Sequence, residues 1–144
     1  MKRLRANPLL RSLRVDKFTI AALEATLAIY REPARALRDI PILAMLARTV
    51  SELRDRADRL RKRLAETEIV ESQASVGGGA FPNTPVPSVA LAFSRDPESL
   101  EHRLRRGDPP VIGRVSDDRL LIDLRSVQPE EDEALAAALR TALA

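Results

Sequence analysis

The first part of the chain carries apolar residues at helical intervals. Between residues 17 and 30 they recur every three or four positions, which places them on one side of an α-helix. These residues are Ile20, Leu23, Leu27 and Tyr30. Asp16 stands directly before the segment and has a side chain suited to an N-cap. The pattern therefore predicts an amphipathic helix over residues 17–30.

Further helical segments follow within the first half. Pro33 and Pro41 each stand where the first turn of a short alanine-rich or apolar helix can begin. Thr49 and Glu52 then have the spacing of a capping box, in which each side chain binds the backbone N–H of the other residue. The longer helix that they open carries one apolar stripe on an otherwise charged surface. The stripe consists of Val50, Leu53, Ala57, Leu60 and Leu64.

The period then changes from helical spacing to alternation. The stretch "EIVESQASVG" alternates, and "SVALAFS" is a second short segment of strand character. Asp96 and Pro97 open a helix that Gly107 ends, and a hairpin is predicted across residues 116–119. A last helix begins near Pro129, with acidic residues in its first turn that complement the helix dipole.

The order of these elements predicts an α+β fold. A helical first half is followed by strand, strand, helix, strand, strand, helix, which suggests a small, mostly antiparallel sheet with helices on one face. We divide the chain into a helical segment, residues 1–66, and an α+β C-terminal small domain, residues 67–144. No Ser/Gly linker separates them, so we expect the two to pack together or against another part of the protein.

Composition excludes several kinds of chemistry. With 44% hydrophobic and 31% charged residues, the chain has the balance of a folded globular protein. It has no cysteine, which removes disulfides, thiolate metal sites and cysteine nucleophiles. Its one histidine, His102, cannot form a multi-histidine metal site or a Ser-His-Asp triad within this chain, and we expect it at the surface. No apolar run has the length of a membrane span, and we interpret the chain as cytosolic.

Positive charge is concentrated near the amino-terminus. The formal net charge is only +3, yet five basic residues and no acidic residue precede Asp16. Two of them, Arg11 and Arg14, are three positions apart, which is close to one helical turn and would let both guanidinium groups bind one anion. Composition alone leaves a second interpretation open, because basic segments are commonly just solvated.

Two further features are candidate ligand contacts. The consecutive glycines Gly77, Gly78 and Gly79 permit close approach of the backbone to a ligand, although a mobile loop or a wide bulge explains them equally well. No lysine-serine pair follows them, so they match neither a P-loop nor a dinucleotide fingerprint. Arg114 lies on a predicted strand, on the face opposite Val115, where it is either solvated or directed at a carboxylate.

Several stretches, taken in series, resemble one protein family. They are "NPLLRSLRVDKFTIAALEATLAIY", "IPILAML", "VGGGAFPNTPVPSVALAF", "LRRGDPPVIGRVSDDRLLIDLRSV" and "PEEDEALAAAL". In this order and spacing, nearly the whole chain is similar to the carboxy-terminal part of bacterial L-seryl-tRNA(Sec) selenium transferase, also called selenocysteine synthase. Each stretch alone is a weak signal, whereas their combination is specific.

The resemblance implies a fold-type-I enzyme that uses pyridoxal 5'-phosphate (PLP) in the cytoplasm and works as a large ring-shaped homo-oligomer. Such an enzyme converts seryl-tRNA(Sec) to selenocysteinyl-tRNA(Sec) with selenophosphate, through a dehydroalanyl species on the cofactor. The α+β half of this chain would then be the small domain of the fold.

The resemblance also assigns roles to residues. Arg11 and Arg14 match arginines that line the family's active site and hold the phosphate of the selenium donor or an analogous anion. Arg114 and the glycines 77–79 would lie in the small domain, as contacts to a carboxylate or to the substrate. The Schiff-base lysine and the tRNA-binding region of the family belong to segments upstream of those matched here, so Lys17 is not the cofactor lysine. We therefore expect the isolated chain to be catalytically incomplete and to bind no cofactor alone.

Two other functions stay open at this stage. The chain could be a non-catalytic assembly or binding module that pairs with an upstream half of the enzyme or with an intact enzyme. It could also be an RNA-binding module that uses its basic end. Neither alternative, nor the transferase itself, implies a metal site or a membrane partner.

Overall fold

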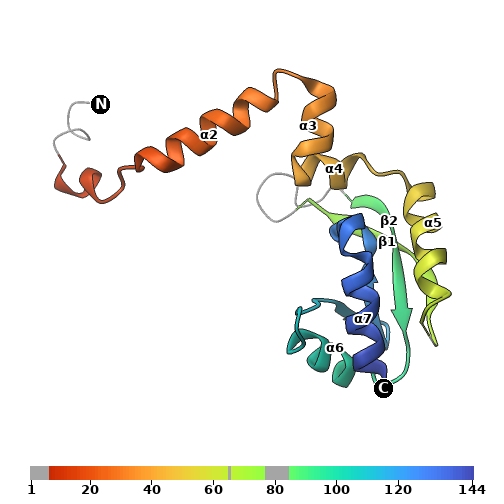
Figure 1. Cartoon of the computed structure of the whole chain (residues 1–144). Helices are drawn as coiled ribbons and strands as arrows, with labels where there is room; N and C mark the ends of the chain where they lie inside the picture. The colour runs from red at the N-terminus through yellow and green to blue at the C-terminus, as the bar shows by residue number, and fades with distance from the viewer. Residues whose placement is uncertain (1–6, 65, 77–84) are drawn as a thin grey trace. The chain divides into compact units, whose positions relative to one another are not determined.

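The chain forms two compact units, Met1–Ala44 and Met45–Ala144. The computed structural model describes residues 7–64, 66–76 and 85–144 (Figure 1). The division at residue 66 that we drew from the sequence follows the change from helices to strands, and it stays a prediction about the domains.

Helices make up the described part of the first unit. They are the 3-10 helix η1 (Pro8–Arg11), α2 (Lys17–Ile29), α3 (Pro33–Asp39) and α4 (Pro41–Ala47), the last of which extends across the boundary. The predicted N-cap of α2 is confirmed, because the carboxylate of Asp16 accepts a hydrogen bond from the N–H of Thr19 at 2.9 Å. No residue of α2 is buried, and the side chain of Phe18 is 88% exposed. The apolar stripe predicted for this helix is therefore left open to solvent.

The second unit contains the sheet. Its elements are α5 (Val50–Arg61), β1 (Glu68–Ser75), β2 (Pro85–Phe93), α6 (Pro97–Arg105), β3 (Arg114–Ser116), β4 (Arg119–Asp123), the short 3-10 helices η2 (Leu124–Ser126) and η3 (Pro129–Glu131), and α7 (Asp132–Leu143). The strand order is β1-β2-β4-β3, and every neighbouring pair is antiparallel. The predicted α+β fold with an antiparallel sheet is confirmed.

Local signals in the sequence account for two of these elements. The capping box of α5 is complete, with the N–H of Glu52 bound to the Thr49 hydroxyl at 3.2 Å and the N–H of Thr49 bound to the Glu52 carboxylate at 2.7 Å. The predicted hairpin joins β3 to β4 through Asp117 and Asp118, whose φ angles are 52° and 56°. Aspartate tolerates this left-handed backbone better than most residues, which explains why the turn forms there.

The core lies between one face of the sheet and helices α5, α6 and α7, which pack over it (Figure 1). Because side chains alternate along a strand, Val89, Leu91 and Phe93 of β2 and Leu120 and Ile122 of β4 all point to this face. The fully buried leucines that the helices contribute are Leu53, Leu100, Leu104 and Leu139. The opposite face of the sheet, here called the open face, carries small residues such as Ala90 and Ala92, and no helix of the second unit packs over these residues.

Arg56, on the buried side of α5, binds the segment that leads into α7. Its guanidinium donates to the carboxylate of Asp132 at 2.6 Å and to the backbone carbonyls of Leu124, Val127 and Gln128 at 3.0 to 3.2 Å. The side chain of Arg56 is only 5% exposed. A buried arginine with an ion pair and three carbonyl acceptors is a fully engaged cation, so this contact fixes the position of α7 against α5.

Arg125 is a second buried arginine, but its side chain binds backbone carbonyls alone, and its Nε–H has no hydrogen-bond partner in the described chain. From η2 it donates to the carbonyls of Met45, Leu46 and Arg48 at 2.8 to 3.3 Å, and to the carbonyl of Pro87 in β2 at 2.5 Å. The carbonyls at the end of α4 have no partner within their own helix, and Arg125 supplies one. The contact holds the end of α4 to the sheet.

Candidate functional site

Arg11 and Arg14 lie in a capped turn before α2. The Asn7 side chain accepts a hydrogen bond from the N–H of Leu9 at 3.0 Å and so caps η1, whose last residue is Arg11. The N–H of Arg14 reaches back to the carbonyl of Arg11 at 3.4 Å. The two arginines are thus one turn apart, although the 3-10 helix itself ends at the first of them. Their joint binding of one anion stays a prediction.

Both guanidinium groups are free to meet a ligand. The side chains of Arg11 and Arg14 are exposed, and no residue in the described ranges forms an ion pair with either. The nearest acid in the sequence, Asp16, is committed to the start of α2, where it accepts from the N–H and the hydroxyl of Thr19 at 2.9 and 2.7 Å. Those two hydrogen bonds hold the pKa of Asp16 below its ordinary value. Asp16 therefore stays ionised at the start of α2, and it forms no ion pair with Arg11 or Arg14 in the described chain.

A polar cluster occupies the open face of the sheet. The carboxylate of Asp123, at the end of β4, accepts hydrogen bonds from the hydroxyls of Ser72 in β1 and Ser88 in β2 at 2.8 and 2.6 Å. It also accepts from the N–H of Arg125 at 3.0 Å. Both serines are buried. One carboxylate thus joins three strands on the face opposite α5, α6 and α7.

Arg114 belongs to the same cluster. From β3 its guanidinium donates to the hydroxyl of Ser72 at 2.8 Å and to the carbonyl of Gln73 at 3.1 Å. It therefore lies on the open face, as the alternation of the strand predicts, and it reaches a carboxylate only through Ser72. A cavity of about 500 Å³ lies beside it and is lined in part by Ser116 and Arg119. Contact of Arg114 with the carboxylate of a substrate stays a prediction.

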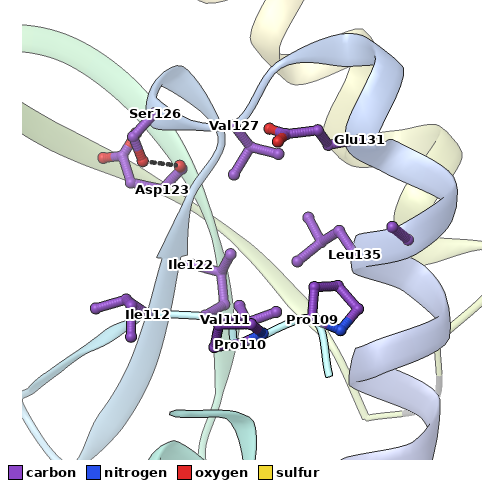
Figure 2. Close-up of a pocket in the computed structure, with 11 residues that line it drawn as sticks. Pro109, Pro110, Val111, Ile112, Ile122, Asp123, Ser126, Val127, Glu131 and Leu135 are labelled. Carbon is purple, nitrogen blue, oxygen red and sulfur yellow. Dashed lines mark hydrogen bonds between the residues drawn. The ribbon is translucent and has the colours of Figure 1, made fainter. Parts of the chain in front are cut away.

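A second hollow is apolar. It measures about 440 Å³ and lies between the segment 109–112, the end of β4 and α7. Figure 2 shows Pro109, Ile122 and Leu135 around it, each from a different one of these parts. Its polar groups are already engaged: the Ser126 hydroxyl donates to the carbonyl of Asp123 at 2.9 Å, and the Glu131 carboxylate accepts from a backbone N–H at 2.9 Å. The hollow offers packing surface and no reactive group.

The remaining predicted features contribute less. Gly77, Gly78 and Gly79 lie outside the described residues, so their role stays a prediction. His102 is exposed on α6, as predicted. The described ranges hold no group of acidic or histidine side chains that could bind a metal ion, and no helix in them is long and apolar enough to cross a membrane.

Comparison with known proteins decides the family. The family model for L-seryl-tRNA selenium transferase (SelA) matches residues 1–128, which is most of the chain. The chain belongs to this family. The resemblance seen in the sequence is thereby confirmed, and the match includes both the basic turn and the polar cluster of the sheet.

Individual members of the L-seryl-tRNA selenium transferase family agree with this assignment. The chain is 44% identical to the L-seryl-tRNA(Sec) selenium transferase of Moorella thermoacetica, 39% to that of Geobacter sulfurreducens and 38% to that of Desulfomicrobium baculatum. These alignments cover 95%, 95% and 100% of this chain, but only 31%, 32% and 33% of the relatives. The chain spans about a third of the length of the curated relatives it matches.

The described residues do not fit the PLP cofactor that the family implies. A Schiff base needs a lysine amine inside a pocket. Lys17 begins α2 and Lys62 is the C-cap of α5, and both are exposed. None of the four main cavities in the described chain has a lysine in its lining.

Ser72, Ser88 and Asp123 are the residues that sequence analysis missed. Asp123 stands inside the run "RLLIDLRS", where it looks like the end of a strand, and the serines lie in two other strands. Alternation places Ser72 on the same face as Val70, but no sequence rule says which strands become neighbours. Only the antiparallel register, which sets Ser72 opposite Ser88, brings the group together.

Proposed function

We propose that this chain serves as the carboxy-terminal part of an L-seryl-tRNA(Sec) selenium transferase, with Arg11 and Arg14 binding the phosphate of selenophosphate. The observation that carries the proposal is a pair of exposed arginines, one turn apart and without an ion pair in the described chain, inside a segment that matches the family. Two guanidinium groups suit a phosphate, because each can donate charge-assisted hydrogen bonds to its oxygens.

The other parts of the reaction are assigned by the family. The substrate would be seryl-tRNA(Sec) and the product selenocysteinyl-tRNA(Sec). PLP would act as the electron sink, held by a lysine in a part of the protein outside this chain. The chain alone would then be catalytically incomplete, and would act in the cytoplasm as part of a homo-oligomer. Arg114 and the glycines 77–79 are proposed as contacts of the small domain to substrate.

The role of the arginine pair is tested in a full-length enzyme. In a chimera that carries this chain in place of the matching third of the Moorella relative, Arg11→Ala with Arg14→Ala should lower kcat/KM for selenophosphate by about 100-fold or more. Each hydrogen bond to a charged partner contributes about 1.5–3 kcal/mol, and desolvation offsets part of this. The measurement is initial rate against selenophosphate concentration with charged tRNA in excess.

Arg31→Ala is the matched control, because Arg31 is also exposed in the first unit and forms no ion pair in the described chain. It should leave kcat/KM unchanged within about twofold, as expected for a solvated surface charge. An unchanged dependence on selenophosphate in the double variant would remove the role that we give to Arg11 and Arg14.

The surface of α2 favours a second function, that of a non-catalytic assembly module. Leu23 and Leu27 are 58% and 55% exposed, and they lie on one side of the helix with Ile20 and Tyr30. The opposite side carries alanines and Phe18, so apolar residues face solvent on two sides. A helix that is apolar on most sides belongs inside a larger core. Its partner would be the part of the enzyme that lies upstream in the family.

The assembly function predicts binding in trans. The purified chain should form a complex with the separately expressed, unmatched part of the Moorella relative, and Leu23→Asp with Leu27→Asp should weaken it by at least about tenfold, because a charge cannot enter an apolar interface without cost. Isothermal titration measures the affinity. Ile112→Asp, at a residue 63% exposed in the second unit, is the control. Equal loss in both variants, or no complex with the parent chain, contradicts this function.

A further inference from the structure

We propose that Asp123 is a positioning residue which, through Ser72, holds the guanidinium of Arg114 on the open face of the sheet as a binding site for an oxyanion, either a phosphate or a carboxylate. The inference rests on the proposed contact of Arg114 with substrate and identifies the residues that orient the Arg114 side chain for this contact. Neither Ser72, Ser88 nor Asp123 has a role in the assignments made above.

The direction of the hydrogen bonds in this cluster is fixed by chemistry. A serine hydroxyl has one hydrogen to donate, and Ser72 gives it to the carboxylate of Asp123 at 2.8 Å. Its lone pairs are then left for the guanidinium of Arg114, which donates to the same oxygen at 2.8 Å. The carboxylate therefore sets the orientation of the hydroxyl, and the hydroxyl sets the position of the arginine.

The cluster is held by three strands. Ser88 in β2 donates to Asp123 at 2.6 Å, and the N–H of Arg125 donates to the same carboxylate at 3.0 Å. With Ser72 in β1, these contacts give Asp123 three donors, which keep it in one place. Ser72 and Ser88 are 8% and 2% exposed, so solvent does not compete for their hydroxyls.

The positive charge of Arg114 is held in place without being neutralised. A guanidinium has five N–H donors. Two serve the Ser72 hydroxyl and the Gln73 carbonyl, both uncharged groups, and no ion pair joins Arg114 to a carboxylate in the described chain. The buried Arg56, in contrast, is paired with Asp132 at 2.6 Å. An exposed arginine without an ion pair can bind an anion. Because the side chain of Arg114 is already oriented, binding loses less side-chain entropy.

The cavity next to Arg114 has room for such a ligand. It measures about 500 Å³, and Arg119 also lines it, with only a long contact of 3.9 Å to Glu68. The acids in its lining have other partners: Glu71 accepts from Arg54 at 3.3 Å, and Asp117 accepts from Ser116 at 3.2 Å. The planar guanidinium fork matches the geometry of carboxylate and phosphate oxygens, which sets the ligand class.

The test uses the 144-residue chain and follows the Nε–H resonance of Arg114, identified by its loss in Arg114→Lys. Inorganic phosphate and acetate are titrated separately. We expect a saturable shift with at least one of them, and the anion with the higher affinity distinguishes a phosphate ligand from a carboxylate. Ser72→Ala and Asp123→Asn should each weaken binding by about tenfold, the effect of losing one hydrogen bond to a charged group.

Three controls separate positioning from a general effect on the fold. Ser72→Thr keeps the hydroxyl and should retain the parent affinity. Asp16→Asn makes the same chemical change at a carboxylate that also accepts a hydroxyl, in the other unit, and should leave Arg114 unaffected. Urea unfolding identifies any variant that fails to fold; should Asp123→Asn do so, the comparison of Ser72→Ala with Ser72→Thr carries the test.

Two results would overturn the inference: no saturable shift with either anion in the parent chain, or parent affinity in both Ser72→Ala and Asp123→Asn. Either result leaves the selenophosphate role of Arg11 and Arg14 untouched, because that role is measured by kinetics in the full-length chimera. A failure of that kinetic test, in turn, would not alter the resonance of Arg114.

Discussion

Replacing Arg56 with methionine is expected to lower the free energy of unfolding of this chain by about 3–5 kcal/mol, the cost of leaving a buried charge without its partner. The guanidinium of Arg56 donates to the carboxylate of Asp132 and to three backbone carbonyls, and its side chain is 5% exposed. Methionine fills much of the volume but donates no hydrogen bond. The carboxylate and all three carbonyls would then lack these donors.

Urea unfolding followed by circular dichroism measures this effect. At a slope of about 2 kcal/mol per molar urea, the midpoint should fall by about 2 M. Arg54→Met is the matched control on the same helix, because Arg54 forms an exposed ion pair with Glu71 at 3.3 Å and should cost less than about 1 kcal/mol. Arg56→Met combined with Asp132→Leu should recover much of the loss, since no unpaired charge then remains. A midpoint shift no larger than that of Arg54→Met would refute this prediction.

Loss of Arg125 should have an effect of similar size. Its guanidinium donates to carbonyls from α4, from Arg48 and from Pro87 in β2, and the residue is 5% exposed. In Arg125→Met these buried acceptors lose their donor, and each buried unsatisfied group costs about 1–3 kcal/mol. Solvent reaches some of them after a local opening, so we expect a total of about 3–5 kcal/mol.

The Arg125 prediction has a local signature as well as a global one. Arg125→Lys keeps the charge but replaces the planar guanidinium with one ammonium group, which cannot donate to acceptors on three segments at once. The free energy of unfolding of Arg125→Lys should therefore lie between those of the parent and Arg125→Met. Proteolysis should cut first near the end of α4, the segment that Arg125 holds to the sheet. Equal stability of Arg125→Lys and the parent, with no new cleavage near the end of α4, would show that the guanidinium is not required to hold this segment.

Local signals in the sequence were sufficient for most elements. The capping box at Thr49 and Glu52 marks the start of α5, and the aspartates between β3 and β4 mark the hairpin, because caps and turns depend on residues within a few positions of each other. The order of elements gave the α+β class for the same reason. The exposure of α2 was not predicted, since an apolar period shows that a helix has a packing face but not what packs against it.

The two candidate sites differ in the same way, because one depends on residues close in the sequence and the other on pairing between distant strands. Arg11 and Arg14 could be found from the sequence because they are three residues apart, and the resemblance of their segment to the family predicts a role for them. The cluster of Ser72, Ser88 and Asp123 could not, because its members come from three strands and meet only through the sheet register.

The sequence by itself predicted the α-helices, the strands, the hairpin and the basic turn, since hydrophobic period, caps, turn residues and charge are local properties of one segment of the chain. The tertiary structure decided which arginines are buried and which are free. Arg56, Arg114 and Arg125 are the same residue type, and they differ in the segments that packing brings to them. Arg56 and Arg125 meet buried acceptors and are structural contacts, whereas Arg114 keeps a charge that a ligand can bind. Pairing between segments that are far apart in the sequence sets the surroundings of each arginine, and no local hydrophobic period encodes that pairing.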